Sequence, residues 1–234
     1  MRVWTPGLLS VSLGAVLLVA SCATQKGADP MAFDKAPLFG MIYDADNQPC
    51  AGVQLAVDGA DGPMSDIRGR FVVPDLARGQ HSMEARKDGF ERLAVTVTFL
   101  NKTDVLHLQM TSFDQLLAMA RAAFTDKRWG DGEGYLRRAE NLNPTDSVLR
   151  YLFAVDAYRT GAFSTAVDYL DLITESDGQK PAVLLLLADI YEKGLADLRK
   201  AIANLEAYLK LRDDPEVQKR LDALKAKVQA GPGG

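Results

Sequence analysis

Few residues of this 234-residue chain have the types and spacing that catalysis or metal binding requires. The sequence contains no Gly-x-Ser-x-Gly nucleophile motif, no phosphate-binding glycine loop and no His-Glu-x-x-His zinc motif. Its two histidines, His81 and His107, fall within strand-like segments, which indicates structural or surface roles. We therefore expect no catalytic residue, no metal site and no cofactor.

Calcium binding is the alternative that the sequence leaves open. Five aspartates of the strand-rich region could gather near one end of it: Asp44, Asp46, Asp58, Asp61 and Asp66. Calcium prefers carboxylate oxygens, but the spacing of these residues follows no ordered pattern of ligands. Aspartate is also common in turns, because its side chain accepts hydrogen bonds from nearby backbone N–H groups. We therefore prefer the interpretation that these residues stabilise turns.

One cysteine, Cys22, has a position with chemical meaning. Arg2 supplies a positive charge, residues 7–20 form an apolar run, and the tripeptide Val19-Ala20-Ser21 precedes the thiol. The run is shorter than the roughly 20 residues that a membrane-spanning helix needs. A positive start, a short apolar run and small residues at its end are typical of a secretory signal peptide.

The sequence Val19-Ala20-Ser21-Cys22 resembles the lipobox of bacterial lipoproteins. The resemblance implies that residues 1–21 are a signal peptide, removed before a Cys22 that carries diacylglycerol and palmitate. Residues 22–36 are then the lipidated cysteine and a flexible tether. Ala23 stands where an aspartate would retain an enteric lipoprotein in the inner membrane. The implied location is the cell envelope, on the periplasmic face of the outer membrane, whereas an ordinary export signal with a chance cysteine is the alternative.

Composition narrows the classes of function further. The chain has 27 basic and 31 acidic side chains and a net charge of −4, which gives no indication of a basic surface for nucleic acid. Its length suits two modest domains.

If Cys22 carries lipid, Cys50 is the only other thiol. We expect Cys50 to pack in a turn, and pairing with another chain is the alternative.

Residues 37–110 are predicted to form strands. Apolar and polar side chains alternate over residues 53–57, 93–99 and 105–110, and turn-forming pairs such as Asp58-Gly59 separate the runs. Short strands with turns at this spacing favour a β-sandwich.

The same region resembles the carboxypeptidase regulatory-like domains. The segment Gly40-Met-Ile-Tyr-Asp44 matches the opening of this family, and Ser65-Asp66-Ile-Arg-Gly69-Arg-Phe71 matches its hairpin motif. The resemblance implies a seven-stranded, transthyretin-like sandwich that has no catalytic residues of its own.

From Ser112 the hydrophobic period becomes helical, and a repeat of 34 residues begins at positions 113, 147 and 181. Spacing and pattern resemble tetratricopeptide repeats, which implies three helical hairpins over residues 112–215. Gly132 stands where the family usually has alanine, and Ala201 comes one residue late, so the third repeat is expected to carry an insertion.

A last amphipathic helix opens at Pro215, and residues 216–230 fit the capping helix that shields the end of a solenoid. Residues 231–234 are expected to be a disordered tail. The predicted fold class is therefore multidomain α+β, with an all-β sandwich followed by an all-α solenoid of tetratricopeptide repeats.

In tetratricopeptide repeats, the first helix of each hairpin lines a concave surface through its second, fifth, ninth and twelfth positions. Eight of these positions are the partner contacts that the resemblance implies here: Leu117, Arg121, Phe124, Tyr151, Val155, Tyr158, Leu185 and Asp189. The remaining four are Asp114, Val148, Ala182 and Glu192. Aromatic residues and arginine are common anchors of protein recognition. Packing of this surface against the sandwich or a second copy of the chain is the alternative.

Together these features predict a non-enzymatic, membrane-anchored adaptor that binds a protein partner through its repeats. A glycan- or peptidoglycan-binding lipoprotein that uses the sandwich is the first alternative, although residues 37–110 contain no tryptophan. A subunit whose active site lies on another chain is the second.

Overall fold

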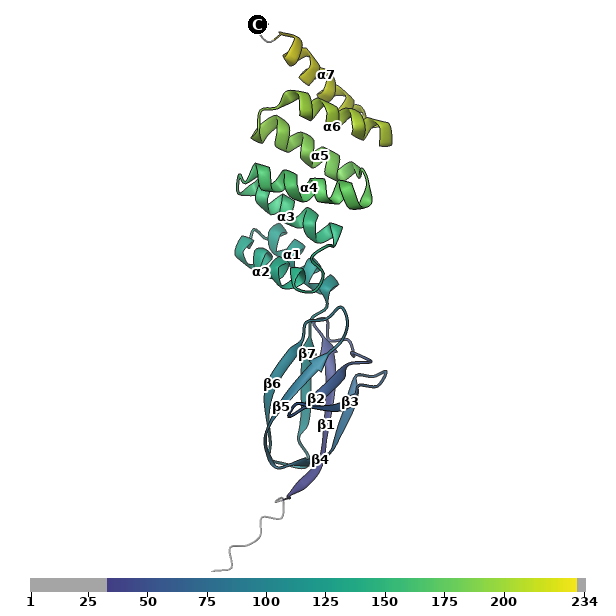
Figure 1. Ribbon diagram of the computed structural model, residues 1–234, viewed down its shortest axis with the longest axis vertical. Coiled ribbons are helices and arrows are strands. Elements are labelled where there is room, and N and C mark those ends of the chain that lie inside the picture. The colour runs from purple at the N-terminus through teal and green to yellow at the C-terminus, as the bar shows by residue number, and fades with distance from the viewer. Residues whose placement is uncertain (1–32, 231–234) are drawn as a thin grey trace, which may run out of the picture. The chain divides into compact units, whose positions relative to one another are not determined.

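The structure is a computed structural model, and it describes residues 33–230. Strands come first along the chain and helices follow (Figure 1). The predicted signal peptide, Cys22, most of the predicted tether and the predicted tail at 231–234 lie outside the described residues. Among the helices that are described, none is both long and apolar enough to cross a membrane.

In the part of the chain that the structure describes, seven strands form two sheets, which confirms the predicted strand-rich half. In the first sheet β1 lies between β4 and β7, pairing antiparallel with β4 and parallel with β7. The second sheet has the order β3-β2-β5-β6, and all of its pairs are antiparallel. The strands are β1 (Lys35–Asp44), β2 (Gln54–Val57), β3 (Ala60–Met64), β4 (Arg70–Ala77), β5 (Gly79–Arg86), β6 (Leu93–Phe99) and β7 (Val105–Met110).

The alternation of side chains along each strand builds the core of the sandwich. In β1, Leu38 and Ile42 are buried, whereas Phe39 between them faces outward. Leu55 from β2 and Met83 from β5 belong to the same buried cluster, so the two sheets share one apolar core. Burial of such apolar surface is the main driving force for folding of this half.

The predicted tether ends earlier than the sequence indicated. Residues 33–36 were assigned to it, but β1 begins at Lys35 and the ring of Phe33 is only 9% exposed. That ring lies 5.0 Å from the ring of Phe99, measured between centroids. The prediction is wrong at this point because a tertiary contact, which local periodicity does not reveal, draws Phe33 into the core.

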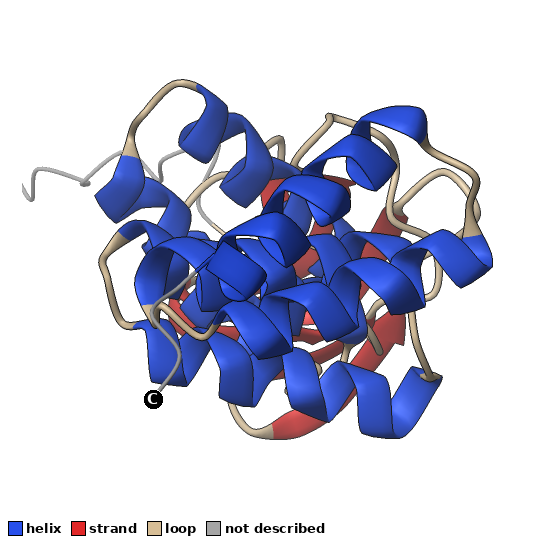
Figure 2. Cartoon of the chain, turned by 90° about the horizontal axis from the view of Figure 1, so that it is seen from above, coloured by secondary structure: helices blue, strands red, loops and turns tan. Residues whose placement is uncertain are grey.

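Within residues 33–230, seven α-helices and one short π-helix follow the strands. They are α1 (Phe113–Thr125), α2 (Trp129–Glu140), α3 (Ser147–Arg159), α4 (Phe163–Asp177), α5 (Pro181–Asp189), the π-helix η1 (Ile190–Gly194), α6 (Leu198–Leu211) and α7 (Pro215–Ala230). Consecutive helices α1 and α2, α3 and α4, and α5 and α6 lie side by side as hairpins (Figures 1 and 2). The predicted tetratricopeptide-like fold of the helical half is confirmed.

The helix starts reproduce the sequence period. The helices α1, α3, α5 and α7 begin at residues 113, 147, 181 and 215, so each start follows the last by 34 residues. Side chains at the start positions fix two of these ends. The hydroxyl of Ser112 accepts a hydrogen bond from the N–H of Gln115, and the carboxylate of Asp146 accepts from the N–H groups of Val148 and Leu149.

The π-helix accommodates the extra residue of the third repeat. The second helices begin at residues 129, 163 and 198, so the last interval is one residue longer than the first. Within the described helices, η1 is the turn where the Leu195 N–H donates to the Ile190 carbonyl at 2.9 Å, five residues back. A π-turn takes up one residue more than an α-turn over the same rise. The insertion is therefore absorbed inside the helix, and Ala201 remains buried.

Candidate binding surface on the helical repeats

Four of the twelve predicted surface positions line one hollow of about 180 Å³ on the repeats. They are Arg121 from α1, Val148 and Tyr151 from α3, and Ala182 from α5. The other lining residues are Ser147, Ile173, Lys180 and Val183. Two of the eight expected contacts, Arg121 and Tyr151, are thus brought together although they lie in different repeats.

The lining of the hollow is mainly apolar. Ile173 and Val183 are buried beneath it, whereas Val148 is 39% exposed at its surface. Tyr151 is half-buried, and its burial, reinforced by the nearby charge of Asp189, raises the pKa of its phenol. The phenol therefore stays neutral at physiological pH. An apolar side chain of a bound segment could therefore be buried against this lining without leaving a charged group unpaired.

Two cations border the apolar lining, and they differ in their availability. The ammonium of Lys180 pairs with the carboxylate of Asp177, which also accepts a hydrogen bond from the Ser147 hydroxyl. Arg121 is exposed, and within residues 33–230 its guanidinium has no ion-pair partner. A carboxylate of a bound segment could therefore pair with Arg121 without displacing an existing partner.

Other expected contacts serve the packing of the repeats. Leu117 is only 6% exposed and belongs to the core of the first hairpin, which corrects its assignment as a partner contact. Tyr158 is half-buried, with its ring 5.9 Å from that of Phe163, and Leu185 packs against the core around α6 and α7. Val155 is half-buried on α3 and does not line the hollow.

Phe124 is occupied by a local contact that explains a departure from the repeat signature. A Cβ atom on Gly132 would lie 2.3 Å from the Phe124 ring, so this ring fills the place where related repeats carry an alanine methyl group. The ring also lies 5.9 Å from the ring of Trp129. Phe124 therefore packs between the two helices of the first hairpin, so its ring is not available to contact a partner.

Asp189 and Glu192 are engaged by the last helix. The guanidinium of Arg220 in α7 donates to Asp189 at 2.6 Å and to Glu192 at 2.6 and 2.9 Å. Lys193 donates to Asp189 as well, at 3.2 Å. The expectation that Asp189 binds a partner is corrected, because α7 already satisfies its charge. Helical periodicity does not reveal this contact, because it places Arg220 only on the polar side of the predicted capping helix.

Two of the five aspartates considered for calcium, Asp44 and Asp66, bind the backbone of their own turns. The carboxylate of Asp44 accepts from the N–H groups of Asp46 and Gln48. That of Asp66 accepts from the N–H of Arg68 and from the backbone and side chain of Arg70, which lowers its pKa to about 2. In the described part of the chain no three acidic, histidine or cysteine side chains gather as a metal site.

Cys50 and the histidines have the structural surroundings that the sequence suggested. Cys50 is only 3% exposed, and burial raises the pKa of its thiol. His81 is buried between two acceptors, with Nδ1 2.7 Å from a carboxylate oxygen of Asp58 and Nε2 2.8 Å from the carbonyl oxygen of Ala77. Both ring nitrogens can donate only in the protonated imidazolium. The hydrogen bond to Asp58 accordingly raises the pKa of His81 above its ordinary value of 6.5.

This arrangement predicts that the sandwich loses stability as the pH rises. A raised folded-state pKa contributes stability that is fully present below the unfolded-state value and is lost as the pH passes through the folded-state value. Urea denaturation of the wild type should therefore give a lower midpoint at pH 8 than at pH 6, and His81→Gln should lessen this difference. His107→Gln, at an exposed position of β7, is the control and should keep it. If the urea midpoint of His81→Gln falls between pH 6 and pH 8 by as much as that of the wild type, His81 is not the source of the pH dependence.

No protein-family model matches this sequence, and no curated protein matches it either. Solved structures match its helical half. The tetratricopeptide-repeat domain of Arabidopsis OM64 is 16% identical, with 49% of this chain and 94% of that chain covered and a TM-score of 0.45. The type III secretion chaperone SycD of Yersinia enterocolitica, in complex with a peptide of the translocator YopD, is 19% identical, with 49% and 93% covered and a TM-score of 0.44.

The first tetratricopeptide-repeat domain of Spaghetti (RPAP3), bound to the HSP90 peptide SRMEEVD, is a third such structure. It is 15% identical, with 50% of this chain and 94% of that chain covered and a TM-score of 0.46. These likenesses concern the fold of the repeats alone.

Proposed function

We propose that this chain is a non-enzymatic, lipid-anchored adaptor of the bacterial cell envelope, and that its repeats bind a segment of another protein. The observation that carries the binding role is the apolar hollow lined by Tyr151 and Val148. The guanidinium of Arg121, which has no ion-pair partner among residues 33–230, lies at its border. An apolar side chain in the hollow and a neighbouring carboxylate on Arg121 would together fix the position of a bound segment.

Support for the anchor comes from the sequence that precedes the described residues. The Arg-led apolar run, the tripeptide Val19-Ala20-Ser21 and Cys22 have the order of a lipoprotein signal. Several acyl chains on one cysteine hold a protein firmly at a bilayer, whereas a single chain holds it weakly. The proposed location is the periplasmic face of the outer membrane, and the sandwich, which resembles carboxypeptidase regulatory-like domains, would separate the repeats from the lipid.

Introduction of a charge into the hollow tests the binding role. Val148 and Val228 are both 39% exposed, but only Val148 lines the hollow, so Val148→Glu and Val228→Glu form a matched pair. Partners captured from envelope extracts are quantified by mass spectrometry, and the affinity of the main partner is then titrated. A glutamate in an apolar site costs on the order of 2–3 kcal/mol, so Val148→Glu should weaken binding about 100-fold.

Two further results decide the interpretation of that experiment. Val228→Glu should bind like the wild type, and Arg121→Gln should weaken binding if the partner presents a carboxylate. Equal affinities of Val148→Glu and the wild type would remove the hollow from the proposal.

The anchor is tested separately, by intact mass and membrane partition of the wild type and Cys22→Ser in a bacterial host. We expect an acylated, membrane-bound wild type and a variant that is neither. A wild type without acyl chains would refute the anchor and the location, but it would leave the binding role of the repeats standing.

A further inference from the structure

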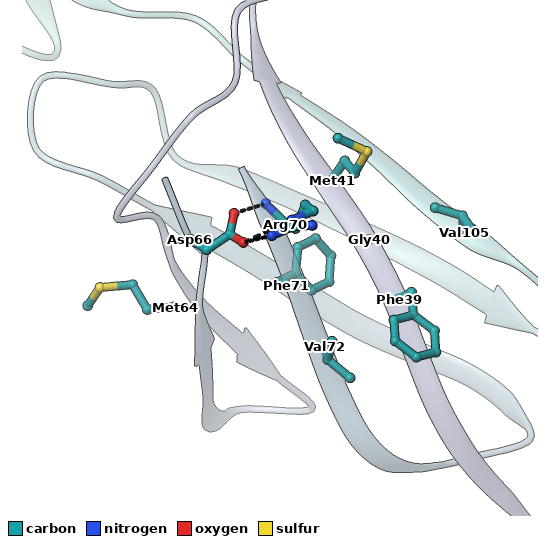
Figure 3. Close-up of a pocket in the computed structure, with 9 residues that line it drawn as sticks. All are labelled: Phe39, Gly40, Met41, Met64, Asp66, Arg70, Phe71, Val72 and Val105. Atoms are coloured by element: carbon teal, nitrogen blue, oxygen red, sulfur yellow. Dashed lines mark hydrogen bonds and ion pairs between the residues drawn. The ribbon is translucent and has the colours of Figure 1, made fainter. Parts of the chain in front are cut away.

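The outer face of the first sheet carries several exposed apolar side chains (Figure 3). One side chain from each strand forms a continuous row, because Phe39 of β1 pairs with Val72 of β4 and with Val105 of β7. These three side chains are 48%, 40% and 50% exposed. Isolated apolar residues are normal at a surface, whereas a contiguous group indicates an interaction.

A hollow of about 500 Å³ extends this row towards the second sheet. Met64 at the end of β3 borders the hollow and is 60% exposed. We call the outward side chains of Phe39, Met64, Val72 and Val105 the sheet face. Figure 3 shows how its members surround the hollow, with Met64 across from Phe39 and Val72.

The polar groups of this hollow are already paired. The guanidinium of Arg70 lies 2.8 Å from the carboxylate of Asp66, and the two are joined in Figure 3. The pair carries no net charge and leaves few hydrogen-bonding groups for a sugar. The sheet face is therefore suited to an apolar occupant more than to a glycan or a strongly charged molecule.

The position of the sheet face along the chain indicates what covers it. Phe39 is the fifth of the ten residues of β1, so the row crosses the middle of the sheet, six residues along the chain from Phe33. Ten residues, 23–32, separate Cys22 from Phe33, and a segment of this length spans at most about 40 Å. A lipid on Cys22 would thus hold the sheet, and with it the sheet face, within reach of a bilayer.

We propose that the sheet face rests on the bilayer that holds the lipid of Cys22, with its apolar side chains in the headgroup region. This inference rests on the anchor proposed above. Tethering makes the contact intramolecular, so even a small apolar surface with little affinity of its own for lipid is held there. Because the Asp66–Arg70 pair is neutral, binding should not require anionic lipids.

A tryptophan reporter in the full lipidated chain tests the contact. The background is Trp129→Phe, since the other tryptophan, Trp4, lies in the predicted signal peptide. Phe39→Trp places the reporter on the sheet face, and Thr96→Trp places it at an exposed position of β6 in the other sheet. Each variant is reconstituted into phosphatidylcholine vesicles with ordinary or brominated acyl chains, which quench only a nearby indole.

Flotation with the vesicles first establishes that the chain is anchored. We expect brominated lipid to reduce the emission of the Phe39→Trp variant about twofold, as for a group at the boundary of headgroups and acyl chains, and to leave that of Thr96→Trp nearly unchanged. Val72→Trp is a second reporter that should behave like Phe39→Trp, in case the larger ring disturbs one position.

Three results would overturn the proposal in distinguishable ways. Flotation with equal quenching of both reporters would refute the contact and leave the anchor intact. Failure to float would refute the anchor and the contact together. A blue shift of the Phe39→Trp emission that grows with protein concentration in lipid-free detergent would mean that a second copy of the chain covers the sheet face.

Discussion

Replacement of Gly69 by alanine is expected to destabilise the sandwich by about 3 kcal/mol or more. Gly69 has a φ of 72°, a left-handed conformation that costs an alanine roughly 1–2 kcal/mol. The added methyl group would also lie 2.4 Å from the carbonyl oxygen of Ile42, which is backbone and cannot rotate away. That carbonyl accepts from the Cys50 N–H, and the Ile42 N–H donates to the Gly69 carbonyl, so relief of the clash would break the pairing of the strands.

Gly52 provides the matched control for this prediction. Its φ is 68°, close to that of Gly69, but a Cβ atom there would meet nothing within 4 Å. Urea denaturation of Gly52→Ala should therefore show only the conformational cost, about 1 kcal/mol. The difference between the two variants measures the steric contribution at Gly69. Equal destabilisation by both would show that the backbone around Ile42 yields easily.

The repeats could be predicted because their period is recorded in residues close together in sequence. Each hairpin buries a small residue at the same place in its first helix, Ala120, Ala154 and Ala188, and all three are 0% exposed. A period of 34 residues fixed the helix starts, and the late Ala201 revealed the insertion that the π-helix absorbs. Local pattern sufficed because the partner of each helix is its neighbour along the chain.

The binding surface could be predicted only in part, since a position on a helix does not specify what packs on it. Arg121 and Tyr151, two of the predicted contacts, line the hollow. Phe124 occupies the space left by Gly132, and Asp189 is bound by Arg220, 31 residues further along. Such contacts depend on tertiary packing, as does the contact between Phe33 and Phe99 that buries Phe33. The sheet face was missed for a related reason: alternation marks Phe39 as outward-facing, but the pairing of three strands is needed to place Val72 and Val105 beside it.

Loss of Arg220 is expected to loosen the last helix. The Arg220 side chain is 28% exposed, and its guanidinium binds the carboxylates of Asp189 and Glu192, whose side chains are 30% and 19% exposed. Arg220→Met keeps much of the apolar stem but leaves two neighbouring carboxylates without their shared partner. Hydrogen bonds to charged groups are stronger than those between neutral groups, and water shields these side chains only in part. We therefore expect Arg220→Met to lower the free energy of unfolding by about 2 kcal/mol. Hydrogen exchange of residues 215–230 should accelerate correspondingly, while the sandwich remains protected.

Neutralisation of the carboxylates separates repulsion from lost bonding. The triple variant with Arg220→Met, Asp189→Asn and Glu192→Gln removes the facing charges, so it should recover part of the protection that Arg220→Met loses. Arg199→Met, at an exposed position of α6, is the control for removal of a positive charge and should leave α7 unaffected. If Arg220→Met also leaves α7 unaffected, the apolar contacts of Val217, Leu221 and Leu224 alone hold this helix on the repeats.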